Sequence, residues 1–187
     1  MNGLHHWLCR SRLWRRTVQA HFLPWVFEDV EPGDDLLELG PGPGVTTDLL
    51  RGNVKRLTAV EIDRLVAHDL AARLAGTNVT VVAGDAARLP FTHGCFSSVV
   101  CFTMLHHVLS SELQDTLFRE VRRVLKPDGI FTGVDIGPSF GMWLVHWGQP
   151  FVPVAPASLA VRLRAAGFKD VAVETGRWVF RFRGAAA

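Results

Sequence analysis

The sequence predicts a single α/β domain built on a seven-stranded, mostly parallel sheet. Five short runs rich in Val, Ile, Leu and Phe recur with helical patterns between them, which is typical of repeated βα units. A glycine-rich turn directly follows the first run. Two alternating runs near the C-terminus flank Gly176 and predict an antiparallel hairpin that closes one edge of the sheet.

The expected strands and helices are short and regularly spaced. The expected strands are Asp35–Leu39, Leu57–Glu61, Val79–Ala83, Ser98–Phe102 and Ile130–Asp135, then Val171–Thr175 and Trp178–Arg183 in the hairpin. The expected helices are Val45–Leu50, Arg64–Leu74, Glu112–Leu125 and Ala157–Ala166. The link Gly84–Phe96 is too short to hold a full helix.

Length and composition restrict the function classes. A chain of 187 residues fits one packed domain, and a net charge of +2 does not favour nucleic acid as a partner. Cys9, Cys95 and Cys101 lack the spacing of metal ligands, so we expect no metal site and reduced thiols in a cytoplasmic protein. The apolar stretch Met142–Val154 is too short to span a bilayer.

Residues 1–30 predict an amphipathic helix that precedes the core of the domain, residues 31–187. Its apolar face would hold Leu4, Trp7, Leu8, Trp14, Val18, Phe22 and Trp25. We expect Pro24 to break this helix or to start a second one. The helix would act as a lid with Trp7, Leu8 or Trp14 over a ligand cleft, make peripheral contact with an anionic membrane, or only pack its apolar face on the sheet with its arginines in solvent.

The glycine-rich turn is the first candidate ligand site. Gly40, Gly42 and Gly44 allow positive φ and let a ligand approach the backbone without meeting a Cβ. The helix expected to start near Val45 adds amides that can hold a carboxylate or a phosphate. A dinucleotide fingerprint would require glycine at position 45, so the spacing argues against a dinucleotide.

Two acids lie at the ends of the next two strands, Glu61 as the last residue of one and Asp85 just after the other. Glu61 can accept hydrogen bonds from both ribose hydroxyls of an adenosyl cofactor, whereas Asp63 is expected to cap the following helix. Asp85 can accept the adenine amino group, and a backbone amide after it can donate to a ring nitrogen.

Taken in order, these motifs resemble those of the class I S-adenosylmethionine-dependent methyltransferases, in the broad small-molecule group related to ubiquinone- and menaquinone-type methylases. The matching stretches are Glu38–Gly44, Glu61, Gly84–Ala86 with Leu89–Phe91, Phe96–Val108, Arg123–Gly129 and Ala165–Phe168. Two positions depart from the pattern, Ser97 for aspartate and Asp128 for glycine, and both are mainly structural in the family.

The resemblance implies a Rossmann-like three-layer sandwich that binds S-adenosylmethionine. The implied cofactor-contact residues are Glu38, Gly40, Pro41, Gly42, Gly44, Glu61, Ile62, Gly84, Asp85, Ala86, Phe102 and Thr103. His106 and His107 follow the fourth strand at the carboxyl edge, where open α/β sheets bind ligands, and are the candidate catalytic bases. Either histidine would alternatively be a buried residue that fixes the loop, and Asp135 would face the cleft or brace the loop after it.

The expected activity is methyl transfer to a small or amphiphilic, lipid-like acceptor, with no nucleic-acid partner. One alternative is a lipid head-group methyltransferase at a membrane surface. The alternatives of another class are an NAD-dependent oxidoreductase and a catalytically inactive module that binds an adenosyl cofactor.

Overall fold

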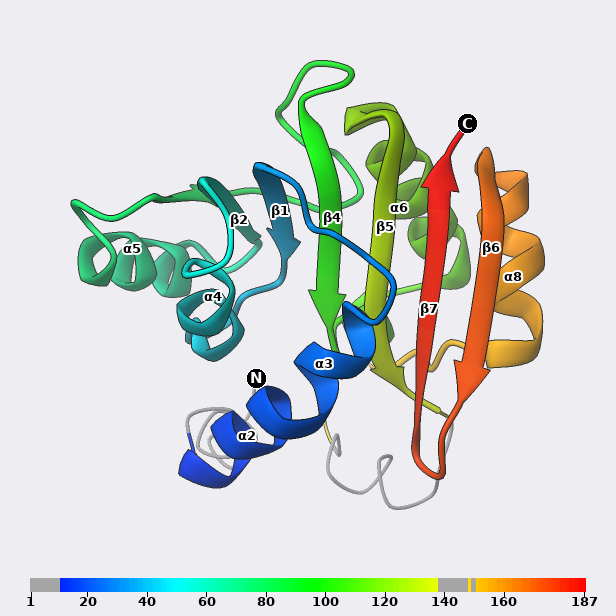
Figure 1. The fold of residues 1–187 in the computed structure, drawn as a ribbon, viewed down its shortest axis with the longest axis horizontal. Coiled ribbons are helices and arrows are strands. Elements are labelled where there is room, and N and C mark those ends of the chain that lie inside the picture. Colours follow the sequence, from blue (N-terminus) through cyan, green and yellow to red (C-terminus); the bar gives the residue numbers. More distant parts are fainter. Residues whose placement is uncertain (1–10, 138–147, 149–150) are drawn as a thin grey trace.

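A seven-stranded sheet with the order β3-β2-β1-β4-β5-β7-β6 organises the structure, a computed structural model that describes residues 11–137, 148 and 151–187 (Figure 1). The strands are β1 (Asp35–Leu39), β2 (Arg56–Glu61), β3 (Val79–Ala83), β4 (Phe96–Phe102), β5 (Leu125–Ile136), β6 (Phe168–Thr175) and β7 (Val179–Ala186). The first five are mutually parallel, and β7 pairs antiparallel with both β5 and β6. The predicted fold class and the C-terminal hairpin are therefore confirmed.

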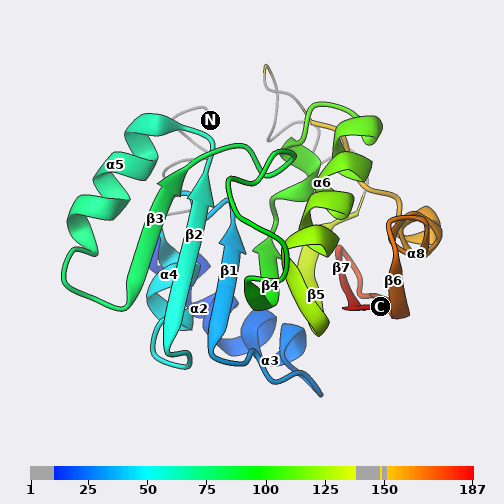
Figure 2. The same ribbon diagram turned by 90° about the horizontal axis from the view of Figure 1, so that it is seen from above.

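Helices cover both faces of the sheet, which makes three layers (Figures 1 and 2). Alternate strand residues explain this, because neighbours in a strand point to opposite faces. Leu37 packs in the cluster that includes Leu117 of α6 (Ser111–Val124) and Leu159 of α8 (Pro156–Ala165). Its neighbour Leu36 packs in a second cluster, on the side of α3 (Leu23–Val26) and α4 (Val45–Leu50).

The remaining helix of the sheet region is α5 (Arg64–Arg73), which lies beside β2 and β3 at one edge of the sheet (Figure 2). The link from β3 to β4 is described throughout and holds no helix there, only an isolated bridge between Asp85 and Arg88.

The largest boundary difference is at β5, which starts at Leu125 instead of Ile130. Leu125 pairs with Phe96 of β4, and the register then shifts before Ser98 pairs with Ile130. Asp128 adopts a φ of +59° in this stretch. Glycine, which the family has at this position, adopts such a backbone freely. Aspartate can replace it because it tolerates the left-handed region better than most residues. Ser97 also has a structural role: its Oγ accepts the Asp35 amide hydrogen bond at 2.9 Å.

The N-terminal segment is helical from Arg12 to Val26, as α2 (Arg12–Thr17), a π-helical turn (Val18–Phe22) and α3. Of the two expectations for Pro24, the second is observed, because it lies in the first turn of α3, where a missing N–H is tolerated. Arg181 of β7 ties α3 to the sheet through the Trp25 carbonyl oxygen at 2.5 Å.

Several expectations lie outside the described residues, namely those for Leu4, Trp7, Leu8, Cys9 and most of Met142–Val154. Within the described ranges, no helix combines the length and the apolar character needed to cross a membrane.

Candidate functional site

A cavity of about 450 Å³ lies at the carboxyl ends of β1, β2, β3 and β4. Its volume is in the range of small-molecule and cofactor sites. The predicted cofactor-contact residues on its wall are Gly40, Pro41, Gly42, Glu61, Ile62, Gly84, Asp85, Ala86, Phe102 and Thr103. The prediction also placed Glu38 and Gly44 in contact with the cofactor, and neither lines the cavity.

The glycine turn has the backbone that its sequence predicts. Gly40, Gly42 and Gly44 have φ values of +66°, +53° and +82°. Their amides donate within the protein: Gly40 to Val60 O at 2.9 Å, Gly42 to Glu61 Oε2 at 3.0 Å, and Gly44 to Pro41 O at 2.9 Å. Because a Cβ on Gly42 would meet no atom within 4 Å, the turn leaves room for close approach of a ligand.

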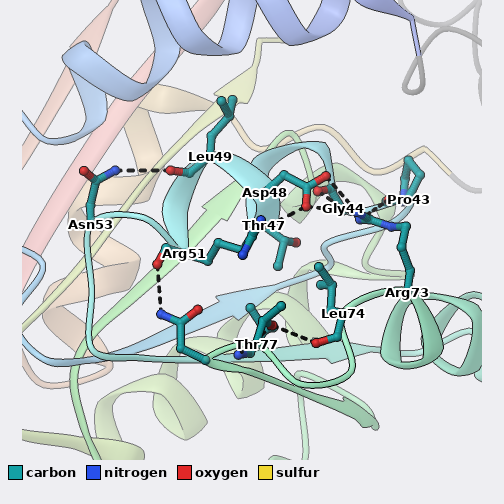
Figure 3. Close-up of polar contacts among 12 residues, drawn as sticks. Pro43, Gly44, Thr47, Asp48, Leu49, Arg51, Asn53, Arg73, Leu74 and Thr77 are labelled. Atoms are coloured by element: carbon teal, nitrogen blue, oxygen red, sulfur yellow. Dashed lines mark hydrogen bonds and ion pairs between the residues drawn. The ribbon is translucent and has the colours of Figure 1, made fainter.

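Gly44 lies on the back of the turn, against α5 (Figure 3). A Cβ at this position would collide with Leu70 and with Arg73. Arg73 pairs with Asp48 through two contacts of 2.9 and 2.8 Å and also donates to the Pro43 carbonyl oxygen at 3.1 Å. Gly44 therefore permits α5 to brace the turn from the side away from the cavity.

Glu38 is buried beneath the same turn, where it links β1 to α4. Its carboxylate accepts hydrogen bonds from the Thr46 hydroxyl and from the Thr47 hydroxyl, the latter at 2.7 Å. Burial raises the pKa of Glu38 to about 7, although the two threonine hydrogen bonds act in the opposite direction. The geometry thus gives Glu38 a supporting place under the cofactor turn.

Glu61 and Asp85 bring two carboxylates to the cavity. Glu61 accepts the amides of Gly42 and Asp63, both at 3.0 Å, and Asp85 accepts the Ala87 amide at 2.8 Å. These bonds fix the orientation of each carboxylate, and each retains lone pairs for further donors. Asp63 caps α5 as predicted, because its Oδ1 accepts the amides at positions 65 and 66.

The two candidate bases occupy different places, because Leu105–His107 forms a 3₁₀ turn in which successive side chains point in different directions. His107 lines the cavity. His106 is buried, with Nδ1 2.5 Å from Oδ1 of Asp135, and the two imidazole rings are 4.2 Å apart. Asp135 also accepts the Leu105 amide at 2.7 Å and therefore braces the loop.

Sequence reasoning missed most of the apolar wall. Met104, Val108, Leu109 and Leu113 line the cavity, and Trp14 of α2 reaches it from the N-terminal segment. Trp14 was one of three residues expected in a lid. The others carried no motif of their own, although Met104 and Val108 belong to the stretch around the histidines. Among the described residues, no group of three His, Cys, Asp or Glu side chains is placed to hold a metal ion.

Comparison with known proteins identifies the class. Residues 37–133 match the family described as a methyltransferase domain, which is more than half of the chain, so the chain belongs to this family. The identification as a class I S-adenosylmethionine-dependent methyltransferase is confirmed.

Individual relatives match over different lengths. The chain is 46% identical over 65 residues to ribosomal RNA small subunit methyltransferase A of Leptothrix cholodnii. The matched stretch covers 34% of this chain and 23% of that protein. It is also 31% identical over 122 residues to demethylmenaquinone methyltransferase of Mycolicibacterium vanbaalenii. This match covers 65% of this chain and 48% of that protein. The chain thus spans less than half of these two relatives.

A solved S-adenosylmethionine-dependent methyltransferase from Aquifex aeolicus has the same fold, with a TM-score of 0.77, 16% identity and full coverage of both chains. The residues on the cavity wall fit the cofactor that the family uses. The cavity combines two fixed carboxylates, suited to ribose hydroxyls and an adenine amino group, with a turn that leaves open space beside the Gly42 backbone. S-adenosylmethionine is accordingly the cofactor.

Proposed function

We propose that this protein transfers the methyl group of S-adenosylmethionine to a small or amphiphilic acceptor that binds beside His107. The observation that carries the proposal is the division of the cavity into two chemically different parts. Glu61, Asp85 and the glycine turn form a polar part suited to the cofactor, whereas Trp14, Val108, Leu109 and Leu113 form an apolar part next to His107.

Residue roles follow from this division. Glu61 would accept the ribose hydroxyls and Asp85 the adenine amino group. The remaining cofactor contacts proposed are the backbone at Gly40, Pro41 and Gly42, and the side chains or backbone of Ile62, Gly84, Ala86, Phe102 and Thr103. Thr103 has a φ of +48°, a backbone state that costs energy. It is stabilised by the hydrogen bond that the Thr103 amide donates to the Val134 carbonyl oxygen at 2.7 Å.

When bound, S-adenosylmethionine supplies a sulfonium-activated methyl group, whose carbon–sulfur bond breaks with its electron pair left on sulfur as the acceptor bond forms. The chain's task is to hold the acceptor in line and to exclude water, which the apolar wall favours. His107 would take the proton that an oxygen acceptor loses. His106 and Asp135 would act behind it as positioning residues, because both are buried and hydrogen-bonded to each other.

A second candidate acceptor is ribosomal RNA, since several relatives carry that activity in their names. The support is limited to the matched part, which covers 23% of the Leptothrix protein and 56% of a Pyrobaculum aerophilum relative. The wall beside His107 has three aliphatic side chains and one aromatic ring, Trp14, which favours an apolar acceptor, since unpaired bases are held mainly by stacking on aromatic or guanidinium planes.

A turnover screen tests the proposal. Purified protein is incubated with labelled S-adenosylmethionine and, in separate reactions, with quinols, phenols, lipids and ribosomal RNA. We expect methylated product from an apolar or amphiphilic acceptor and a large loss of that product in His107→Ala. Methylation of RNA alone would refute the acceptor class. Cofactor binding with no turnover on any acceptor class would instead support the inactive module.

A further inference from the structure

The rim of the cavity carries a concentration of exposed aliphatic side chains. Large apolar side chains that are exposed within the described ranges are Leu13, Ile62, Leu65, Leu109, Leu113, Val161 and Trp178. Ile62, Leu109 and Leu113 lie in the cavity wall itself. Leu13 and Leu65, which are 73% and 78% exposed, immediately precede the wall residue Trp14 and the residue Val66, also in the wall. Three of these seven side chains therefore line the cavity, and two more are the immediate sequence neighbours of residues in its wall.

Exposed aliphatic side chains gathered around an opening are unusual for a surface that meets only water. They come from separate parts of the chain, namely α2, the β2–α5 connection, the start of α5, the loop before α6 and the start of α6. Ile62, Leu109 and Leu113 share one cavity wall although they are far apart in the sequence, so the exposed apolar side chains do not all belong to one helix face. An apolar surface of this kind beside an opening is suited to contact with an apolar phase.

The helix that carries Leu13, α2, is also cationic. Arg12, Arg15 and Arg16 are exposed, and none of them forms an ion pair with any residue that the structure describes. No acidic residue precedes Glu28 in the sequence, so no carboxylate from the start of the chain offsets these charges. The rest of the protein is close to neutral, with a net charge of +2 for the whole chain. The positive charge of α2 is therefore local.

We propose that this rim, defined by Leu13, Leu65, Leu109 and Arg12, Arg15 and Arg16, docks on the surface of an anionic lipid bilayer. The aliphatic side chains would enter the headgroup region while the arginines pair with lipid phosphates. The cavity would then open toward the bilayer, so that an amphiphilic acceptor passes into it without crossing water. This inference rests on the proposed function for the acceptor, but the docking itself does not depend on turnover.

Vesicle co-sedimentation tests the docking. The probes are vesicles of phosphatidylglycerol mixed with phosphatidylcholine, vesicles of phosphatidylcholine alone, and a ribosomal RNA fragment, at low and high salt. We expect binding to the anionic vesicles that weakens with salt, and weaker binding to the neutral ones. The double variant Leu13→Ser, Leu65→Ser should lose about tenfold in partitioning, and each arginine changed to Ser should lose about fivefold.

Matched controls come from the same protein. Val161 is 64% exposed on α8 and lies outside the rim, so Val161→Ser should leave vesicle binding unchanged. Arg119, exposed on α6 and outside the cavity wall, supplies the charge control as Arg119→Ser. Titration with S-adenosylhomocysteine checks every variant, because Leu13 and Leu65 do not line the cavity and their loss should not change cofactor affinity.

The outcomes separate the two proposals. Normal S-adenosylhomocysteine binding without vesicle binding would overturn the docking inference and leave the methyltransferase assignment intact. An equal loss of vesicle binding in the rim variants and in the control variants would also overturn the docking inference. Binding to the RNA fragment but not to vesicles would show that α2 serves nucleic acid instead. Vesicle binding without cofactor binding would support the docking surface and contradict the proposed function.

Discussion

The pH dependence of stability tests whether Glu38 is buried beneath the glycine-rich turn. Its pKa is raised from 4.5 to about 7, chiefly by burial. Between these two values the unfolded chain loses the Glu38 proton while the folded protein keeps it, so the free energy of unfolding falls as pH rises. The difference corresponds to about 3 kcal/mol, which is fully expressed above pH 7.

The assay is urea unfolding of the wild type and of Glu38→Gln at a series of pH values. The variant has no proton to lose at this position, so contributions from other acids cancel in the difference between the two proteins. We expect the wild type to lose about 3 kcal/mol relative to the variant from below pH 4.5 to above pH 7. A flat difference would refute the burial argument for Glu38.

A control of opposite sign is available at Glu120. Its hydrogen bond and ion pair with Arg123 lower its pKa, so its contribution to stability is present above its unfolded pKa and is lost as pH falls through the folded value. In Glu120→Gln the difference from the wild type should therefore change in the reverse direction. A change in the same direction as for Glu38→Gln would show that the assay reports something other than these two carboxyl groups.

Three further perturbations test other parts of the structure. Gly44→Ala should lower the free energy of unfolding by about 1–3 kcal/mol in thermal or urea denaturation, because its φ is +82° and a Cβ would collide with α5; an unchanged value would contradict this. Asp135→Asn should cost about 1–3 kcal/mol of stability through its buried contact with His106, and turnover should fall more than S-adenosylhomocysteine affinity; an equal loss of both would argue against a positioning role. Burial raises the pKa of the Cys101 thiol, so peptide mapping after alkylation of the folded protein should find Cys95 modified and Cys101 intact, and equal labelling would show that the core opens.

The sequence predicted the sheet well because its signals are local. Runs of β-branched and large apolar residues mark strands wherever both faces are buried, as Leu36 and Leu37 show by packing on opposite sides. The start of β5 was missed because Lys126–Gly129 has the composition of a turn and has no partners in β4, although Leu125 before it pairs with Phe96 and Ile130 after it pairs with Ser98. Composition alone does not reveal such a register shift.

The polar part of the cavity was predictable for a different reason. Glu61 ends β2 and Asp85 follows β3, and the carboxyl ends of parallel strands meet at one edge. The apolar part was not predictable in this way. Whether His106 or His107 faces the cavity depends on a single 3₁₀ turn, and the exposure of Leu13 and Leu65 depends on how separate elements meet.

The central claim is that Glu61 and the glycine turn bind S-adenosylmethionine in this cavity, and calorimetric titration with S-adenosylhomocysteine tests it most directly. We expect the wild type to bind, Glu61→Gln to bind about ten- to a hundredfold more weakly, and the exposed control Glu112→Gln to match the wild type. Absence of binding by the wild type, or equal affinity in Glu61→Gln, would contradict the assignment of this site.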